Sequence, residues 1–191
     1  MKYKDEQIAF MRNEQKRSKY INSETGMYVG DRLIKFHQIE LLSFFRIMMP
    51  EEFTQMAPEL ASKKYPSVDR PQVIMTDEAD EVNFTFSLFE QEIEAEKIDG
   101  TLNQFQLMIT TAQPANKFMN KGHIENDEYR CGWMEFKSHT LDGAVYNLLS
   151  ITVLNESFLL GLFNCPYEAW LEWKPVMLEL LNTIHGKEEA E

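Results

Sequence analysis

Residues 144–163 read AVYNLLSITVLNESFLLGLF, and this stretch decides the fold. It holds two nearly continuous apolar runs, residues 148–154 and 158–163, with the turn-forming pair Asn155 and Glu156 between them. A strand with one face in water alternates apolar and polar residues, whereas a strand covered on both faces is apolar almost throughout. The stretch therefore predicts two consecutive strands at the centre of a sheet that is covered on both sides.

A further strand is expected directly before this pair, over residues 129–139. Asp142 and Gly143 separate it from the strand that follows, and Asp-Gly is a preferred two-residue hairpin turn. The three strands are therefore expected to form an antiparallel meander.

A helix is expected directly after the second apolar run. Asn164 can cap a helix, and Pro166 fits the first helical turn, where its missing N–H is not needed. Pro175 is expected to split the helical region into a short turn and a main helix, and Gly186 is expected to end it. The inward stripe of this region consists of Trp170, Trp173, Met177, Leu180, Leu181 and Ile184.

A second amphipathic helix is expected after Thr101. Thr101 and Gln104 have the spacing of a capping box, in which hydroxyl and amide satisfy each other's backbone donors, and Pro114 ends the helical pattern. A polar loop is expected from there through Gly122. The apolar stripe of this helix consists of Leu102, Phe105, Met108, Ile109 and Ala112.

The first half of the chain is expected to supply a hairpin, three strands and one helix. Gly30 and Asp31 between apolar arms predict a type II′ hairpin turn. Alternation of apolar and polar residues over 82–88 predicts a half-buried strand. The other expected elements are a strand over residues 39–49 ended by Pro50, a helix over Pro58–Lys64 and a strand over residues 73–75.

This order of elements predicts an α+β fold, a three-layer α/β/α sandwich with a mostly antiparallel sheet. One domain is expected over residues 26–186. It is preceded by a polar extension over residues 1–25 and followed by a solvated tail over residues 187–191.

Three segments resemble the PsbP-like superfamily, which includes the photosystem subunit PsbP, the Ran-binding factor Mog and bacterial DcrB-type proteins. They are FRIMMPEEF at residues 45–53, FNCP at residues 163–166 and the terminal helix over residues 173–184. The resemblance spans residues 36–184. It implies an α/β/α sandwich that serves as a binding or assembly module, in some bacterial relatives as a chaperone for secreted toxins. It supplies no catalytic residues.

Composition and charge exclude several classes of protein. Thirty-one acidic against 19 basic residues give a net charge of −12, which argues against a general nucleic-acid binder. Two cysteines rule out a disulfide-dense scaffold, and no apolar run approaches the ~20 residues that span a bilayer. The N-terminal residues lack the continuous apolar core of a secretory signal. A cytoplasmic protein without a cofactor is therefore expected.

The acidic residues are concentrated between residues 76 and 100. Nine acids against Lys97 alone give this segment a charge of −8. A solvated face is one interpretation, because charge on a strand edge prevents aggregation; a docking surface for a basic partner is the other. A calcium loop is disfavoured, since the spacing departs from the EF-hand pattern. The residues predicted to bind a partner are Asp77, Glu78, Asp80, Glu81, Glu90, Glu92, Glu94 and Glu96.

The residue types that carry most catalysis are scattered. His37, His123, His139 and His185 form no local pair with metal-ligand spacing. Cys131 and His139 are eight residues apart on one expected strand, roughly 26 Å, beyond hydrogen-bond reach. Cys165 lies beside the expected helix start, which can lower the pKa of a thiol, but a small buried residue is the favoured interpretation. Phosphate-binding and hydrolase motifs are missing from the sequence.

The sequence therefore predicts a non-enzymatic, cytoplasmic protein-binding or assembly module whose partner is a basic or apolar protein. A chaperone-like role for a secreted protein is one form of this function. The alternative is a domain that binds a small molecule or lipid in an apolar pocket between the sheet and the terminal helix. Trp170, Trp173 and Met177 would line that pocket. Neither nucleic acid, membrane nor metal is expected as a partner.

Overall fold

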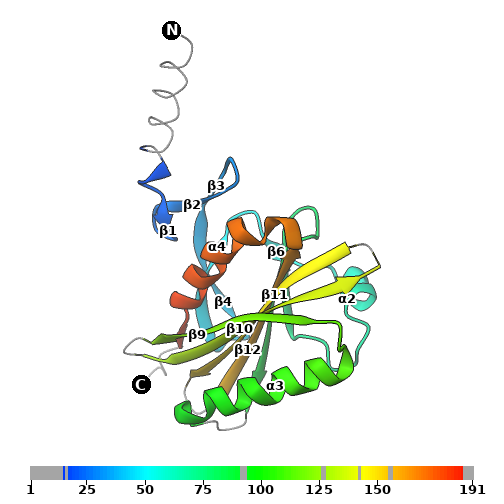
Figure 1. Cartoon of the computed structure of the whole chain (residues 1–191). Coiled ribbons are helices and arrows are strands. Elements are labelled where there is room, and N and C mark those ends of the chain that lie inside the picture. Colours follow the sequence, from blue (N-terminus) through cyan, green and yellow to red (C-terminus); the bar gives the residue numbers. More distant parts are fainter. Residues whose placement is uncertain are drawn as a thin grey trace.

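The computed structural model describes residues 15, 17–90, 94–125, 128–141, 143–154 and 157–186. At its centre is a seven-stranded, fully antiparallel sheet, here called the main sheet (Figure 1). In spatial order its strands are β6 (Thr54–Gln55), β7 (Val73–Thr76), β8 (Asn83–Phe89), β12 (Ser157–Pro166), β11 (Gly143–Leu154), β10 (Arg130–Thr140) and β9 (Lys117–Glu125). The two apolar runs become β11 and β12, which lie inside the sheet as predicted.

Helices cover both faces of the main sheet (Figure 1). The helix α4 (Trp170–Asn182) packs on one face, and α3 (Ile98–Ala112) with the short α2 (Pro58–Lys64) packs on the other. The predicted α+β sandwich is confirmed. In the part of the chain that the structure describes, no helix combines the length and apolar character needed to cross a bilayer.

The α4 face carries a second, small sheet that the sequence analysis did not predict. Its order is β13-β5-β4, with β4 (Phe36–Leu41), β5 (Phe45–Pro50) and β13 (His185–Gly186). Phe45 of β5 lies in the same hydrophobic core as the buried residues of α4, and its ring lies 5.4 Å from that of Phe86 in β8. The single strand predicted over residues 39–49 is wrong, because Leu42 and Ser43 form a turn with φ of 56° and 53°.

The predicted hairpin at Gly30 is confirmed. The strands β2 (Gly26–Val29) and β3 (Arg32–Ile34) flank it, and β1 (Ile21–Asn22) pairs with β2. Gly30 has a φ of +57°, as the first central residue of a type II′ turn requires. This three-stranded sheet is joined to α4 by Ser23, whose N–H and hydroxyl donate to Glu179 Oε1 at 2.9 and 2.8 Å.

Several predicted segments lie outside the described residues. They are residues 1–14 and 16 of the extension, Glu92, Asp142 of the hairpin turn, the turn pair Asn155 and Glu156, and the tail over residues 187–191.

The predicted start and end of the terminal helix are wrong. β12 continues through Pro166, so Asn164 and Cys165 are strand residues, and a 3-10 turn, η2 (Tyr167–Ala169), precedes α4. Gly186 does not end the helix but pairs with Phe45 in β13.

α4 also runs unbroken through Pro175, contrary to the prediction. An internal proline costs about 3 kcal/mol, and burial of each large apolar side chain returns about 1.5–3 kcal/mol. The expected inward stripe supplies that burial, since Trp173, Met177, Leu180 and Leu181 are buried, and Val176, which was not predicted, is buried as well.

α3 begins three residues before the predicted cap. It follows a 3-10 turn, η1 (Ala95–Lys97), and Thr101 lies inside the helix, where its hydroxyl donates to the carbonyl of Lys97 at 3.1 Å. The capping box is therefore wrong. Leu102, Phe105 and Ile109 face the sheet as predicted, whereas Met108 is 62% exposed.

Gly132 of β10 allows α3 to approach the main sheet closely. A Cβ at this position would lie 2.4 Å from Ile98 Cγ2 and 2.9 Å from Leu102 Cδ1. This close contact places the first turn of α3 directly on the strand.

Two further predictions about strands need correction. The polar loop through Gly122 is instead the edge strand β9, paired with β10. The strand β8 is not half-buried as predicted. Asn83 and Thr85, which were expected to face solvent, are only 4% and 3% exposed. The burial of Asn83 and Thr85 follows from the position of β8 inside the sheet, between β7 and β12, on the face that also carries α2.

Candidate functional site

A row of three asparagines crosses the three middle strands of the main sheet, β8, β12 and β11, towards one end of these strands. Asn164 of β12 pairs in register with Asn83 of β8 on one side and with Asn147 of β11 on the other. Directly paired residues present their side chains on the same face. We call these three residues the asparagine row. At ~4.8 Å between strands it spans roughly 10 Å, on the face that carries α2 and α3.

The hydrogen bonds of the row leave one buried oxygen without a donor. Asn83 Nδ2 donates to Asn164 Oδ1 at 2.9 Å, and Asn164 Nδ2 donates to the hydroxyl of Tyr65 at 3.4 Å. Asn83 Oδ1 has no hydrogen-bond partner among the described residues. A buried polar atom left unsatisfied costs about 1–3 kcal/mol, so this oxygen calls for an explanation.

A groove of about 710 Å³ lies over the asparagine row. Its walls come from the end of α2, from the turn before β8, from the hairpin joining β10 to β11 and from the start of η2. The charged residues that line it are Lys64, Asp80, Glu81 and Glu168. The ammonium group of Lys64 donates a hydrogen bond to the backbone carbonyl of Asp80. Three carboxylates against one ammonium make this groove acidic.

The turn before β8, residues 77–81, is shaped by its own first carboxylate. Asp77 Oδ1 accepts the backbone N–H groups of Glu81 at 2.8 Å and Val82 at 3.0 Å. Asp80 adopts a φ of 58°. We call this segment the acidic turn. Among the described residues, the carboxylates of Glu78, Asp80 and Glu81 make no ion pair.

The acidic turn also lines a second hollow, of about 540 Å³. Asp77 and Glu78 line it together with Arg32 and Glu52, which form an ion pair with each other. The acidic turn therefore contributes carboxylates to two neighbouring hollows.

The remaining acids of the predicted partner surface lie at the opposite end of β8. Glu90, Glu94 and Glu96 follow the strand, whereas the acidic turn precedes it, and seven strand residues extend roughly 23 Å. Glu94 is also paired with Lys97 at 3.0 Å. The structure thus brings the acidic turn to a groove and places the other described acids elsewhere.

The residues of the alternative ligand pocket fill the core under α4. Trp173 is 5% and Met177 1% exposed, and the ring of Trp173 contacts those of Phe53 and Phe163. Trp170 stacks on Tyr146 with ring centroids 5.5 Å apart. Neither of the two hollows is lined by these three residues.

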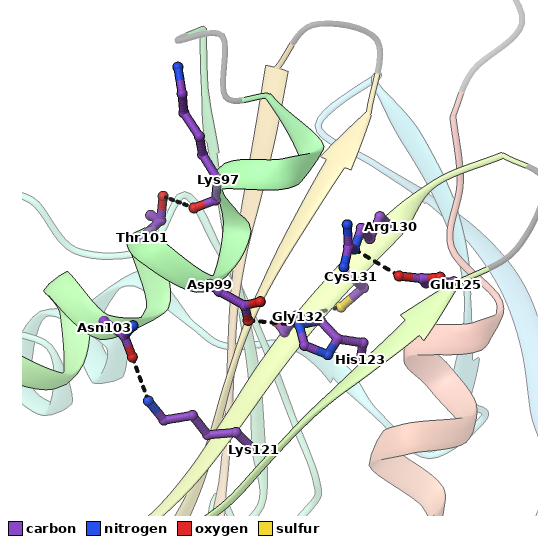
Figure 2. A network of polar contacts seen from close by, with 10 residues as sticks. All are labelled: Lys97, Asp99, Thr101, Asn103, Lys121, His123, Glu125, Arg130, Cys131 and Gly132. Carbon is purple, nitrogen blue, oxygen red and sulfur yellow. Dashed lines mark hydrogen bonds and ion pairs between the residues drawn. The ribbon is translucent and has the colours of Figure 1, made fainter.

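A network of polar contacts joins α3 to β9, and Arg130 of β10 pairs with Glu125 of β9 beside it (Figure 2). His123 of β9 and Asp99 of α3 are 2.8 Å apart, and Lys121 donates to Asn103 at 2.7 Å. Two of the four histidines therefore have acidic partners: His123 pairs with Asp99, and His185 pairs with Glu128. Over the residues that the structure describes, no three potential ligands gather as a metal site.

The thiols lie in the core and not at a reactive site. Cys131 and Cys165 are unpaired and 0% and 1% exposed. Burial raises the pKa of each to about 12. The favoured interpretation of Cys165 as a small buried residue is confirmed. The alternative, a thiol pKa lowered by a helix start, is wrong, because this residue lies in β12.

Both thiols are therefore expected to be inert in the folded protein. Only the thiolate attacks a disulfide reagent, and a raised pKa removes the thiolate at neutral and mildly alkaline pH. A thiol–disulfide colour assay should detect no fast thiol before unfolding and both after unfolding in guanidinium chloride. Rapid modification of either cysteine in the native protein would contradict the buried placement.

The fold and the groove define a class: a three-layer α+β sandwich whose open polar groove lies at one end of its main sheet. No family model matches this sequence, and the comparison with curated proteins gives no match. Solved structures show which fold it is.

Cyanobacterial PsbP (CyanoP) from Synechocystis sp. PCC 6803 is similar, with a TM-score of 0.59 and 12% identity, over 85% of this chain and 98% of that one. The Ran-binding protein Mog1p of Saccharomyces cerevisiae has a TM-score of 0.51 and 10% identity, over 80% and 95%. LpqN of Mycobacterium tuberculosis, involved in cell envelope biogenesis, has a TM-score of 0.51 and 8% identity, over 88% and 99%. The chain has the PsbP-like fold, which confirms the resemblance at the level of the fold.

Proposed function

We propose that this protein is a non-enzymatic binding module that holds a basic segment of a partner protein at the acidic turn. The observation that carries the proposal is the meeting of unpaired carboxylates with an open groove of about 710 Å³. The fold is consistent with such a role, because Mog1p, which shares it, is a Ran-binding protein. A chaperone-like role for a secreted protein is one form of this function.

Electrostatics favour a basic partner at this place. The chain carries a net charge of −12, so its field attracts positively charged surfaces during encounter. Carboxylates that already have an ion-pair partner gain little from a second one. Those of Asp80 and Glu81 lack a partner among the described residues and are free to take one.

The chemistry of the groove favours binding over catalysis. A general acid or base works best with a pKa near the working pH. Burial instead raises the pKa of Tyr65 and brings that of Cys165 to about 12. The other groups of its floor are amides and hydroxyls, which suit recognition by hydrogen bonds. We place this function in the cytoplasm, where buried free thiols remain reduced.

The test compares two matched pairs of neutralising substitutions. Asp80→Asn with Glu81→Gln alters the groove, and Glu90→Gln with Glu96→Gln alters the opposite end of β8. Asparagine suits the positive φ of position 80. Each double variant loses two carboxylates, so net charge is equal in both.

Wild type and the Glu90/Glu96 variant should capture the same basic partner from native lysate of the source cells. The Asp80/Glu81 variant should bind that partner about tenfold more weakly, equivalent to about 1.4 kcal/mol. Binding by wild type should weaken further as salt is added, because salt screens exposed charges. Equal affinity of both variants for the captured partner would refute the proposal.

A further inference from the structure

We infer that the groove over the asparagine row receives an arginine side chain of the partner, whose guanidinium group donates to Asn83 Oδ1. This inference rests on the proposed function, since it names the group of the partner that enters the groove.

The floor of the groove contains one buried amide acceptor that has no donor among the described residues. Asn83 gives its Nδ2 to Asn164, which leaves the Oδ1 atom of Asn83 buried and without a donor in the described structure. Asn147, at the other end of the row, also uses its Nδ2 within the protein. Its Nδ2 lies within hydrogen-bond distance of Ser138 Oγ at 2.9 Å, and within 3.3–3.4 Å of the carbonyls of Val145 and Phe136.

The rim of the groove adds negative charge beside the buried acceptor. Asp80 and Glu81 precede Asn83 by only three and two residues, and all three line the groove. A group that binds in the groove therefore lies close to the acidic turn. Asn83 Oδ1 is covered in this conformation, so the Asn83 amide has to turn toward the groove to accept a hydrogen bond from that group. The occupant that fits has several N–H donors and a positive charge.

A guanidinium group meets these demands better than an ammonium group or a metal ion. Guanidinium carries five donors in a plane and is weakly hydrated, so it loses less on entering a half-buried site. An ammonium group is a strongly hydrated point charge that exposed carboxylates alone can hold. A metal ion is disfavoured, because the described residues bring no three ligating side chains together.

Binding of short capped peptides to the whole, ¹⁵N-labelled protein tests the inference. Acetyl-Gly-Arg-Gly-amide is titrated while the side-chain amide signals of Asn83, Asn147 and Asn164 are followed by NMR. Peptides with lysine or with citrulline in place of arginine serve as controls. Citrulline keeps most of the shape of arginine and loses its charge.

The arginine peptide should shift the three amide signals saturably, and the lysine peptide should bind at least about fivefold more weakly. The citrulline peptide should give no saturable shift. Asn83→Ala should weaken the arginine peptide about tenfold, the effect of one lost hydrogen bond to a charged group. Asn103→Ala on α3, away from the groove, should leave its affinity unchanged.

Equal binding of the arginine and lysine peptides, or shifts confined to residues 77–81, would overturn the inference. So would the absence of any saturable shift with arginine. If Asn83→Ala does not fold, the comparison of the three peptides on wild type still decides. The proposed function itself would fail on a different result. It would fail if the variant with Asp80→Asn and Glu81→Gln still captured the partner as well as the control variant.

Discussion

Replacing Lys174 with methionine is expected to lower the free energy of unfolding by about 3–5 kcal/mol, the cost of leaving a buried charge unpaired. Glu135 of β10 is 0% exposed and faces α4, where the ammonium group of Lys174 forms an ion pair with its carboxylate. Asn120 adds a hydrogen bond from Nδ2 to Glu135 Oε2 at 3.3 Å. Methionine keeps the length of the side chain and removes only the charge.

An exposed ion pair provides the matched control. Lys97 and Glu94 are 3.0 Å apart, and their side chains are 66% and 67% exposed. Lys97→Met should therefore cost less than about 1 kcal/mol. Combining Lys174→Met with Glu135→Gln should recover most of the lost stability, since no unpaired charge remains. Urea unfolding checks all three variants, and a similar small loss for Lys174→Met and Lys97→Met would show that Glu135 is solvated.

The second large effect is expected from Phe163→Ala, which should cost about 3–5 kcal/mol. Phe163 of β12 is 0% exposed and lies where the main sheet meets α4. Its ring centroid is 4.7 Å from that of Phe84, 6.2 Å from Tyr146 and 6.3 Å from Trp173. Three aromatic neighbours cannot collapse into the space left by alanine, so a cavity should remain.

Phe89→Ala is the control for this substitution. Phe89 is 42% exposed and touches the same strand through a single stacked ring, that of Phe158 at 4.6 Å. Its removal should cost about 1 kcal/mol, the worth of one aromatic pair. If denaturant midpoints show equal losses for Phe89→Ala and Phe163→Ala, the packing between α4 and the sheet is looser than described.

The centre of the fold follows directly from the sequence, because burial on both faces leaves a clear pattern. The runs over residues 148–154 and 158–163 admit few polar residues, and this places them inside the sheet without knowledge of any neighbour. Turns that rely on backbone conformation leave a weaker pattern. Leu42 and Ser43 adopt positive φ values, although neither glycine nor asparagine marks the place.

The asparagine row was missed for a related reason. Asparagine is uncommon in strands, so each member of the row interrupts an otherwise apolar or alternating pattern. Taken alone, Asn83 fits a solvent-exposed position of an alternating strand, and Asn164 fits the cap of a helix. The three asparagines become neighbours only through the register of the strands. The register between strands that are not consecutive in the chain, such as β8 and β12, cannot be predicted from the local sequence.

The acidic segment shows how far proximity in sequence can mislead. Residues 76–100 appear as one block of charge, yet β8 runs through the middle of this block and separates its two ends. In the described structure the first end, the acidic turn, lines the groove over the asparagine row. The sequence could predict that acids gather here, and the sheet decides which of them can act together.

The most direct test of the account is the NMR footprint of the captured partner on this protein. Backbone amide shifts and line broadening should concentrate on the acidic turn at residues 77–81, the hairpin around Thr140 and Gly143, and the start of η2 at Tyr167–Ala169. These segments surround the asparagine row. A footprint centred on Glu94 and Glu96, or on the outer surfaces of α3 and α4 with these segments unchanged, would contradict the account.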